Sequence, residues 1–167
     1  MIDLHLHLDG SLSKEDFIFL ANKEGIDLPK DFPNCIYVPK NCTSLEEYLE
    51  RFELPLKLLQ SEDNLIYAVK TLVNRLYDLG YIYVEIRFAP QLHLEKGLTQ
   101  LEVLQSVVRG LKEALKDKKD FTANIIACLM RQEPYDVNKE TIEAVIKLND
   151  PKVVALDLAG PEAYLPS

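Results

Sequence analysis

Residues 2–8, with the sequence IDLHLHL, alternate between polar and apolar side chains, which is the two-residue period of a β-strand. The alternation predicts one face made of Asp3, His5 and His7 and an opposite face made of Leu4, Leu6 and Leu8. A second alternating stretch, YIYVEIRF, occupies 81–88. The more continuously apolar stretches 121–130 and 153–159 predict two further strands.

Helical patterns separate these four strands, and most of them carry a local start or stop signal. Ser13 and Asp16 cap the first expected helix, and Gly25 ends it. A capping box at 44–47 opens the second, which Pro55 ends or kinks, and the third covers 65–76 and closes at Gly80. Thr99 and Glu102 cap the fourth, and Asn138 starts the fifth. Residues 27–43 contain three prolines and predict a long loop.

The order of the predicted elements is β-α-β-α-β-α-β, with extra helices in the first crossover, which predicts an α/β fold with a parallel sheet. An open doubly wound sheet is covered on both faces, whereas polar residues on one face of the first two strands favour a barrel with a polar mouth. A TIM-type (β/α)8 barrel needs about 250 residues. We therefore expect residues 1–167 to form the N-terminal half of one barrel domain, whose C-terminal half is absent.

Composition narrows the class of protein. Apolar residues make up 47% of the 167 positions and charged residues 28%, as in globular proteins. The net charge of -8 argues against a nucleic-acid partner, because such binding relies on Lys and Arg. No apolar run is long enough to cross a membrane. The three cysteines, Cys35, Cys42 and Cys128, match no metal-ligand spacing, so we expect reduced thiols and a cytoplasmic protein.

His5 and His7 are the strongest chemical signal in the sequence. On a strand their Cα atoms lie about 6.5–7 Å apart and their side chains point the same way. A single metal ion can bridge that separation, and we interpret the pair as metal ligands. Asp3 or Asp9 could serve as an improvised third ligand. The spacing alone does not identify the metal.

The stretch His5-Leu6-His7-Leu8-Asp9-Gly10-Ser11 resembles the first-strand motif of the adenosine deaminases, which belong to the metal-dependent amidohydrolase superfamily of (β/α)8 barrels. The segments at 44–60, 83–93, 128–134 and 153–162 resemble the corresponding family segments in the same order, so that the resemblance covers the whole chain. Adenine deaminases typically have an acidic residue where this chain has Ala89. The resemblance therefore favours a nucleoside over a free base as substrate.

The resemblance implies a role for each matching residue. His5 and His7 would bind a catalytic zinc ion, and His7 would also lie against the substrate. Asp9 would accept a hydrogen bond from the ribose 5′-hydroxyl, and Gly160 would offer its backbone N–H to purine N3. The implied reaction is hydrolytic deamination of adenosine or deoxyadenosine to inosine or deoxyinosine and ammonia.

The family also implies that the remaining catalytic groups come from later strands: a third zinc histidine, a proton-shuttling glutamate, an orienting histidine and a pair of aspartates. We therefore expect residues 1–167 alone to hold zinc weakly and to be inactive. Within the chain, we expect Glu85 and Arg87 to pair as structural support, Asp157 to be an interior structural residue, and His93 to be a loop residue rather than a metal ligand.

Three other functions remain open at this point. A half-barrel with two unpaired sheet edges could be a non-catalytic unit that assembles with itself, as a homo-oligomer, or with a partner. The parent enzyme could be an adenine deaminase or another amidohydrolase. A phosphoesterase of the histidinol-phosphatase type also begins with paired histidines, but the sequence that follows His7 differs from the pattern usual there.

Overall fold

A computed structural model describes residues 1–37 and 50–160 of the chain. Its sheet contains β1 (Ile2–His7), β2 (Tyr83–Phe88), β3 (Thr122–Met130) and β4 (Val153–Ala159). The helices are α1 (Lys14–Glu24), α3 (Glu53–Leu58), α4 (Glu62–Asp78), α5 (Gln100–Leu115) and α6 (Tyr135–Leu148). The predicted capping box at 44–47 and Cys42 lie outside the described residues. The predicted loop 27–43 is described only as far as residue 37.

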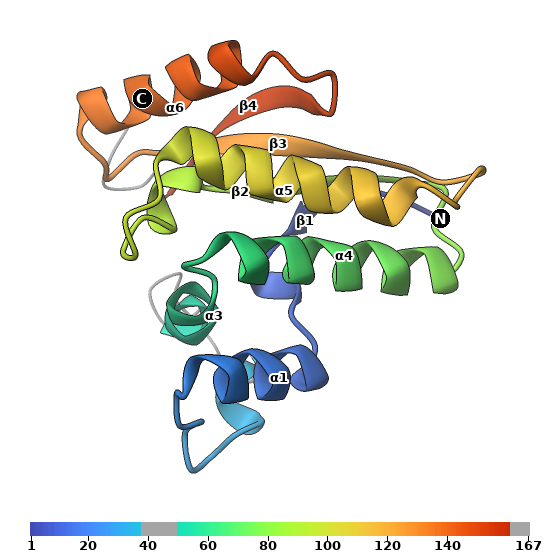
Figure 1. Cartoon of the computed structure of the whole chain (residues 1–167), viewed down its shortest axis with the longest axis vertical. Helices are drawn as coiled ribbons and strands as arrows, with labels where there is room; N and C mark the ends of the chain where they lie inside the picture. Colours follow the sequence, from blue (N-terminus) through green and yellow to red (C-terminus); the bar gives the residue numbers. More distant parts are fainter. Residues whose placement is uncertain (38–49, 161–167) are drawn as a thin grey trace.

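The four strands form one parallel sheet in the order β1-β2-β3-β4. A doubly wound sheet reverses its strand order at a switch point, whereas a barrel adds each strand beside the previous one. The sheet therefore has the topology of the first half of a (β/α)8 barrel, and the predicted fold class is confirmed. In Figure 1, α4, α5 and α6 lie along one side of the sheet, while α1 and α3 extend beyond β1.

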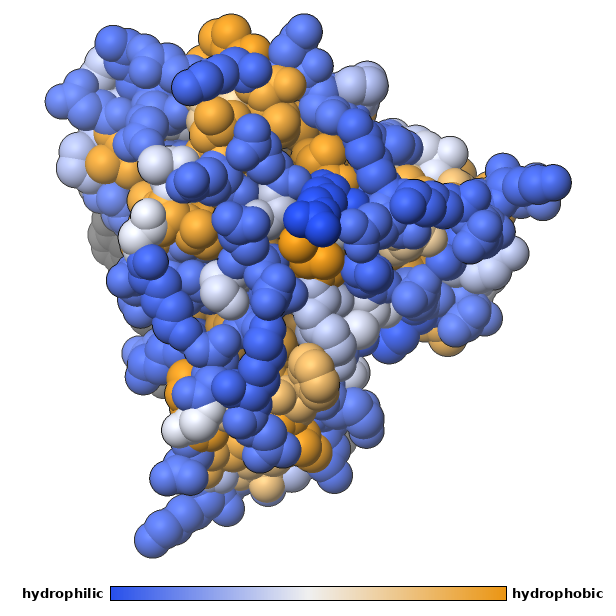
Figure 2. All heavy atoms as spheres, viewed as in Figure 1, coloured by the Kyte–Doolittle hydropathy of each residue, from blue (hydrophilic) through white to orange (hydrophobic). Residues whose placement is uncertain are grey.

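The hydrophobic core lies between the sheet and these helices. On β2, Val84, Ile86 and Phe88 are buried, and the side chains between them point to the other face of the sheet. Buried leucines and valines of α4 and α5 meet them from the opposite side. The solvent side of the helices is mostly hydrophilic in Figure 2, with apolar patches between charged side chains. Polar and reactive side chains therefore lie on the opposite face of the sheet.

Gly110 lets α4 and α5 approach each other closely. A Cβ atom at this position would lie 2.5 Å from Cγ1 of Val69 and 2.9 Å from the backbone oxygen of Ile66. The backbone oxygen cannot rotate away as a flexible side chain can, so only glycine fits here without moving one helix. This contact sets the spacing of the two helices that support the centre of the sheet.

The predicted capping boxes at Ser13 and Thr99 are both present, and Gly25 ends α1 in the left-handed conformation. Asp16 has a second role: its carboxylate lies 2.5 Å from Nη1 of Arg75 on α4. Arg75 also donates to the backbone oxygen of Ser11. The N-terminus of α1 is therefore tied to α4 as well as capped.

Two predicted helix boundaries need correction. The sequence predicts that Pro55 ends or kinks a helix that opens at 44–47, which lies outside the described residues. Pro55 ends no helix, but lies in the first turn of α3, where the missing N–H has no partner within a helix anyway. Asn138 does not start α6, which begins at Tyr135. The Asn138 side chain instead bonds the backbone N–H and C=O of Met130, each at 2.9 Å, and so joins the helix to the end of β3.

The first strand departs from the predicted alternation. The register of β1 against β2 shifts by one residue between Asp3 and Leu6. Asp3 therefore pairs with Val84, whose side chain is in the core, whereas His7 pairs with Arg87 on the opposite face. Asp3 does not share the face of His7; its carboxylate accepts a hydrogen bond from the backbone N–H of His5 at 2.9 Å.

None of the helices in the described part of the chain is long and apolar enough to cross a membrane.

Candidate active site

A cavity of about 580 Å³ opens at the carboxyl ends of the four strands. Each strand contributes a lining residue near its end: His7 from β1, Arg87 from β2, Met130 from β3 and Ala159 from β4. The carboxyl end of the strands is where barrels of this topology place their active sites. All four predicted site residues, His5, His7, Asp9 and Gly160, line this one cavity.

His5 and His7 lie side by side in the cavity, with ring centres 5.4 Å apart. Two imidazoles that bind one tetrahedral zinc ion, each through a nitrogen at about 2.0–2.1 Å, have ring centres about 5 Å apart. The pair thus fits two positions of a zinc site. The described residues contain no group of three His, Cys, Asp or Glu side chains that could hold a metal. Neither Asp3 nor Asp9 is brought in as a third ligand.

The surroundings of His7 favour its neutral form. Burial lowers its pKa below the usual value, His5 and Arg87 lower it further, and the Asp157 carboxylate opposes them. A histidine must be neutral to bind a metal ion. The environment of His7 is therefore compatible with the role of a ligand, and the ring is also fixed by an edge contact with Phe52 at 6.1 Å between centres.

Asp9 begins the turn that follows β1, and its side chain is buried at the wall of the cavity. Its carboxylate accepts a hydrogen bond from the backbone N–H of Gly10 at 3.0 Å. Burial raises the pKa of Asp9 to about 6, while the backbone hydrogen bonds oppose the shift. A buried carboxyl group with free acceptor capacity is suited to bind a hydroxyl group of a ligand.

Gly160 follows β4 with a φ of 110°, a conformation that residues with a side chain rarely adopt. An added Cβ would lie 2.5 Å from Oε1 of Gln132 and 3.3 Å from the backbone N of Arg131. The backbone therefore approaches its neighbours without a side chain between them, at a point that lines the cavity. A flat ligand could reach a backbone group here.

The predicted Glu85–Arg87 pair is wrong. Nη1 of Arg87 lies 2.7 Å from Oδ2 of Asp157, on β4, and Glu85 instead accepts a hydrogen bond from the Tyr83 hydroxyl at 2.7 Å. Arg87 on β2 thus reaches across β3, whose Cys128 pairs with Asp157 in the register. Burial and the Asp157 charge raise the pKa of the Cys128 thiol to about 12, so this cavity thiol is not a nucleophile at neutral pH.

One wall of the cavity is apolar, and the sequence patterns did not single it out. It consists of Phe52 and Leu56, around the start of α3, and Leu92, after β2. Phe52 and Leu56 are four residues apart, which is the spacing of one helical face, but nothing local showed that this face meets the histidines. The wall and the polar strand ends together form a site with one apolar side and a few fixed polar groups, as small-molecule sites usually have.

His93 lies outside the cavity, behind that wall, and is completely buried. Its Nδ1 is 2.8 Å from the backbone oxygen of Leu59, and burial lowers its pKa to about 4. At neutral pH the ring therefore has one N–H, which Nδ1 donates to that carbonyl. This agrees with the prediction of a structural loop histidine, since the residue is the last of the turn after β2.

Comparison with known sequences gives a consistent result. The sequence model of the family described as adenosine deaminase matches residues 1–167. The chain is 44% identical over 165 residues to an adenosine deaminase of Clostridium perfringens and 42% identical over 170 residues to an adenosine deaminase of Haemophilus ducreyi. The two alignments cover 96% and 97% of this chain but 49% of each relative. The chain thus spans about half the length of the curated relatives it matches.

Solved structures share the fold. An adenine deaminase of Arthrobacter aurescens matches with a TM-score of 0.83 at 22% identity, over 99% of this chain and 50% of its own. An amidohydrolase of Burkholderia ambifaria with bound Zn matches with a TM-score of 0.84 at 16% identity, over 99% and 45%. An Arabidopsis protein complexed with IMP has a TM-score of 0.78 at 25% identity, over 95% and 49%.

Proposed function

Since the chain belongs to the adenosine deaminase family, we propose that the protein containing residues 1–167 hydrolyses adenosine, and deoxyadenosine, to inosine or deoxyinosine and ammonia. The observation that carries this proposal is the single cavity in which His5, His7, Asp9 and Gly160 meet. His5, His7 and Asp9 come from β1 and the turn directly after it, and the fold brings Gly160, after β4, to the same cavity.

His5 and His7 would hold the zinc ion through their ring nitrogens. When bound, zinc would activate a water molecule for attack on C6 of the purine. The names of the relatives and the bound Zn of one structural neighbour support this assignment. The described residues supply two ligands, so we propose that the other ligands and the general acid come from residues outside them.

The chain's own residues would orient the nucleoside. Asp9 would accept a hydrogen bond from the ribose 5′-hydroxyl, and the backbone N–H of Gly160 would meet purine N3. The apolar wall of Phe52 and Leu56 would cover one side of the base. Ala89, which also lines the cavity, would leave space for the sugar where an adenine deaminase typically has an acidic residue.

The apolar outer face of β4 supports the proposal that further barrel units complete the site. Leu156 and Leu158 pair with Ala127 and Leu129 on the helix side of the sheet, yet they remain 42% and 38% exposed. In a barrel of this topology the next helix packs on this face.

The proposal includes a cytoplasmic location, which rests on the unpaired thiols of Cys35 and Cys128.

The test is a comparison of adenosine and adenine as substrates of the full-length protein, followed through the ultraviolet absorbance of the purine. We expect turnover of adenosine that a zinc chelator abolishes and added zinc restores. The 167-residue chain alone is expected to show neither turnover nor zinc that survives dialysis, because two histidines do not make a complete site. Turnover of adenine with no reaction of adenosine would show that the substrate assignment is wrong.

A further inference from the structure

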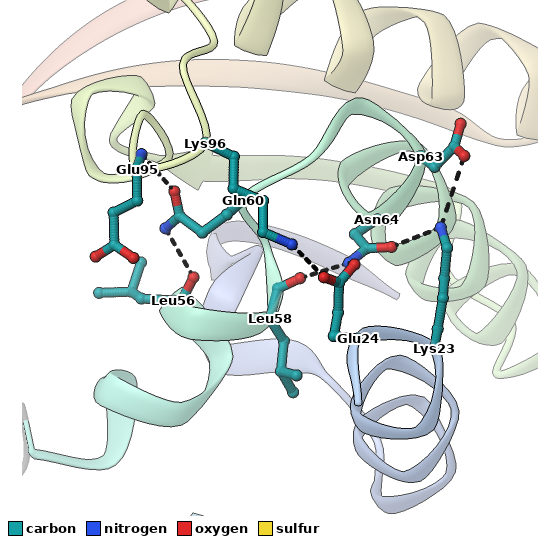
Figure 3. A network of polar contacts seen from close by, with 9 residues as sticks. All are labelled: Lys23, Glu24, Leu56, Leu58, Gln60, Asp63, Asn64, Glu95 and Lys96. Carbon is teal, nitrogen blue, oxygen red and sulfur yellow. Dashed lines mark hydrogen bonds and ion pairs between the residues drawn. The ribbon is translucent and has the colours of Figure 1, made fainter. Parts of the chain in front are cut away.

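Polar contacts around two buried amide side chains, Gln60 and Asn64, connect α1, α3, α4 and the segment after β2 (Figure 3). Gln60 lies between α3 and α4 and is 1% exposed. Nε2 of Gln60 donates to the backbone oxygens of Leu56 and Leu92, at 2.8 and 2.9 Å. Oε1 accepts from the backbone N–H of Glu95 at 2.9 Å. Both N–H groups and the oxygen of the amide are thus used.

Two of these three partners belong to the wall of the cavity. Leu56 and Leu92 both line it, and they come from segments that are far apart in the sequence. The side chain of Gln60 therefore joins the α3 part of the apolar wall to the part that follows β2. Because each bond goes to a backbone group, Gln60 fixes where these two segments run and not merely how one side chain is rotated.

His93 makes a second connection between the same two segments. The ring of this residue, directly after Leu92, donates to the backbone oxygen of Leu59, directly before Gln60. On its other side the ring contacts Phe88, with centres 5.8 Å apart. The two connections are reciprocal. The side chain of Gln60 bonds to the backbone of Leu92 and Glu95, and the side chain of His93 bonds to the backbone of Leu59. Such a reciprocal pair prevents the segments from sliding past each other.

Asn64 provides the internal comparison. It is 0% exposed and belongs to the same network, but its partners lie away from the cavity. Nδ2 donates to the backbone oxygen of Leu58 at 2.7 Å and to Oε1 of Glu24 at 2.6 Å, and Oδ1 accepts from Nζ of Lys23 at 2.8 Å. None of Lys23, Glu24 and Leu58 lines the cavity. Gln60 and Asn64 are thus two buried amides that each make three hydrogen bonds. Only Gln60 bonds to residues of the cavity wall.

We propose that Gln60 is a positioning residue, which sets the apolar wall of the cavity and thereby the affinity for the nucleobase. This inference rests on the proposed function. The wall contacts an apolar ring that changes little between the bound substrate and the transition state, so its displacement weakens both equally. The loss therefore shows in KM and leaves kcat nearly unchanged.

The test compares Gln60→Met with Asn64→Leu in the full-length protein. Each substitution replaces an amide by an apolar side chain of similar shape and removes three hydrogen bonds, although the backbone oxygen of Leu56, Glu24 and Lys23 each keep another contact. We expect both variants to have a lower Tm. Only Gln60→Met is expected to raise the KM for adenosine, on the order of tenfold, with kcat changed by less than about twofold. Gln60→Asn, which keeps an amide but is one methylene shorter, is expected to raise KM less.

A second measurement does not depend on activity. The methyl NMR signals of Leu56 and Leu92 are expected to shift in Gln60→Met and Gln60→Asn and to stay in place in Asn64→Leu. Absence of deaminase activity in the wild type would defeat the proposed function, and the methyl signals would then decide the positioning role alone. Equal KM values for Gln60→Met and Asn64→Leu, or unmoved Leu56 and Leu92 signals in both Gln60 variants, would overturn the inference.

Discussion

A His7→Ala variant of the full-length protein is expected to lose its zinc and its deaminase activity, the latter by about 10³-fold or more. His7 lies next to His5 in the cavity, and its ring is fixed by Phe52. Removal of one imidazole leaves His5 as the single ligand from β1, and zinc affinity depends on ligand number and geometry. The measurements are metal content by atomic absorption and the rate of inosine formation.

The matched control for this prediction is His93→Asn. His93 is also a histidine near the cavity, but its Nδ1 donates to the Leu59 carbonyl and its ring does not line the cavity. Asparagine can place an N–H close to the position of Nδ1, so this variant is expected to keep stoichiometric zinc. If His7→Ala also kept stoichiometric zinc and more than a tenth of the activity, His7 would not be a ligand.

The stability difference between wild type and His93→Asn is expected to depend strongly on pH. Burial lowers the pKa of His93 to about 4 in the folded protein, against about 6.5 for an unfolded chain. Above pH 6.5 the ring is neutral in both states. Between about 6.5 and 4 the unfolded chain takes up the proton first, so the wild type loses stability as the pH falls. From pH 7.5 to 4.5 this loss amounts to roughly 2 to 3 kcal/mol.

The variant has no such group, so its free energy of unfolding should approach or exceed that of the wild type at pH 4.5. Asp9 has the opposite effect on the free energy of unfolding: because its pKa is raised to about 6 in the folded protein, it stabilises the fold as the pH falls. Asp9 is present in both proteins, however, and cancels in the difference. Urea denaturation of the two proteins at pH 7.5 and 4.5 measures the effect. An equal stability difference at both pH values would mean that His93 is accessible to protons in the folded protein.

The parts of the fold that the sequence predicted correctly depend on local signals. Ser13 and Thr99 cap their helices through residues three positions away, and Gly25 ends α1 because it can adopt a positive φ. Strand alternation on β2 likewise comes from a single segment. Such features need no knowledge of the rest of the chain, and they were sufficient for the element order and the barrel topology.

The features of the site that sequence analysis missed are mainly contacts between distant segments. The register shift that moves Asp3 away from the face of His7 is a property of the pairing of β1 with β2. The partner of Arg87 lies on β4, 70 positions away, whereas the sequence pattern favours Glu85, which is close to Arg87 along the chain. Gln60 belongs to no periodic pattern, and its function is evident only from the two backbone carbonyls that it holds together.

The most direct test of the account is the position of zinc in a crystal of the full-length protein, located by anomalous scattering at the zinc edge. We expect one peak per chain in the cavity at the strand ends, about 2.0–2.1 Å from a ring nitrogen of both His5 and His7. The remaining ligands should come from residues beyond those described here. A full-occupancy zinc peak that neither histidine touches, or a complete zinc site elsewhere with His5 and His7 unligated, would contradict it.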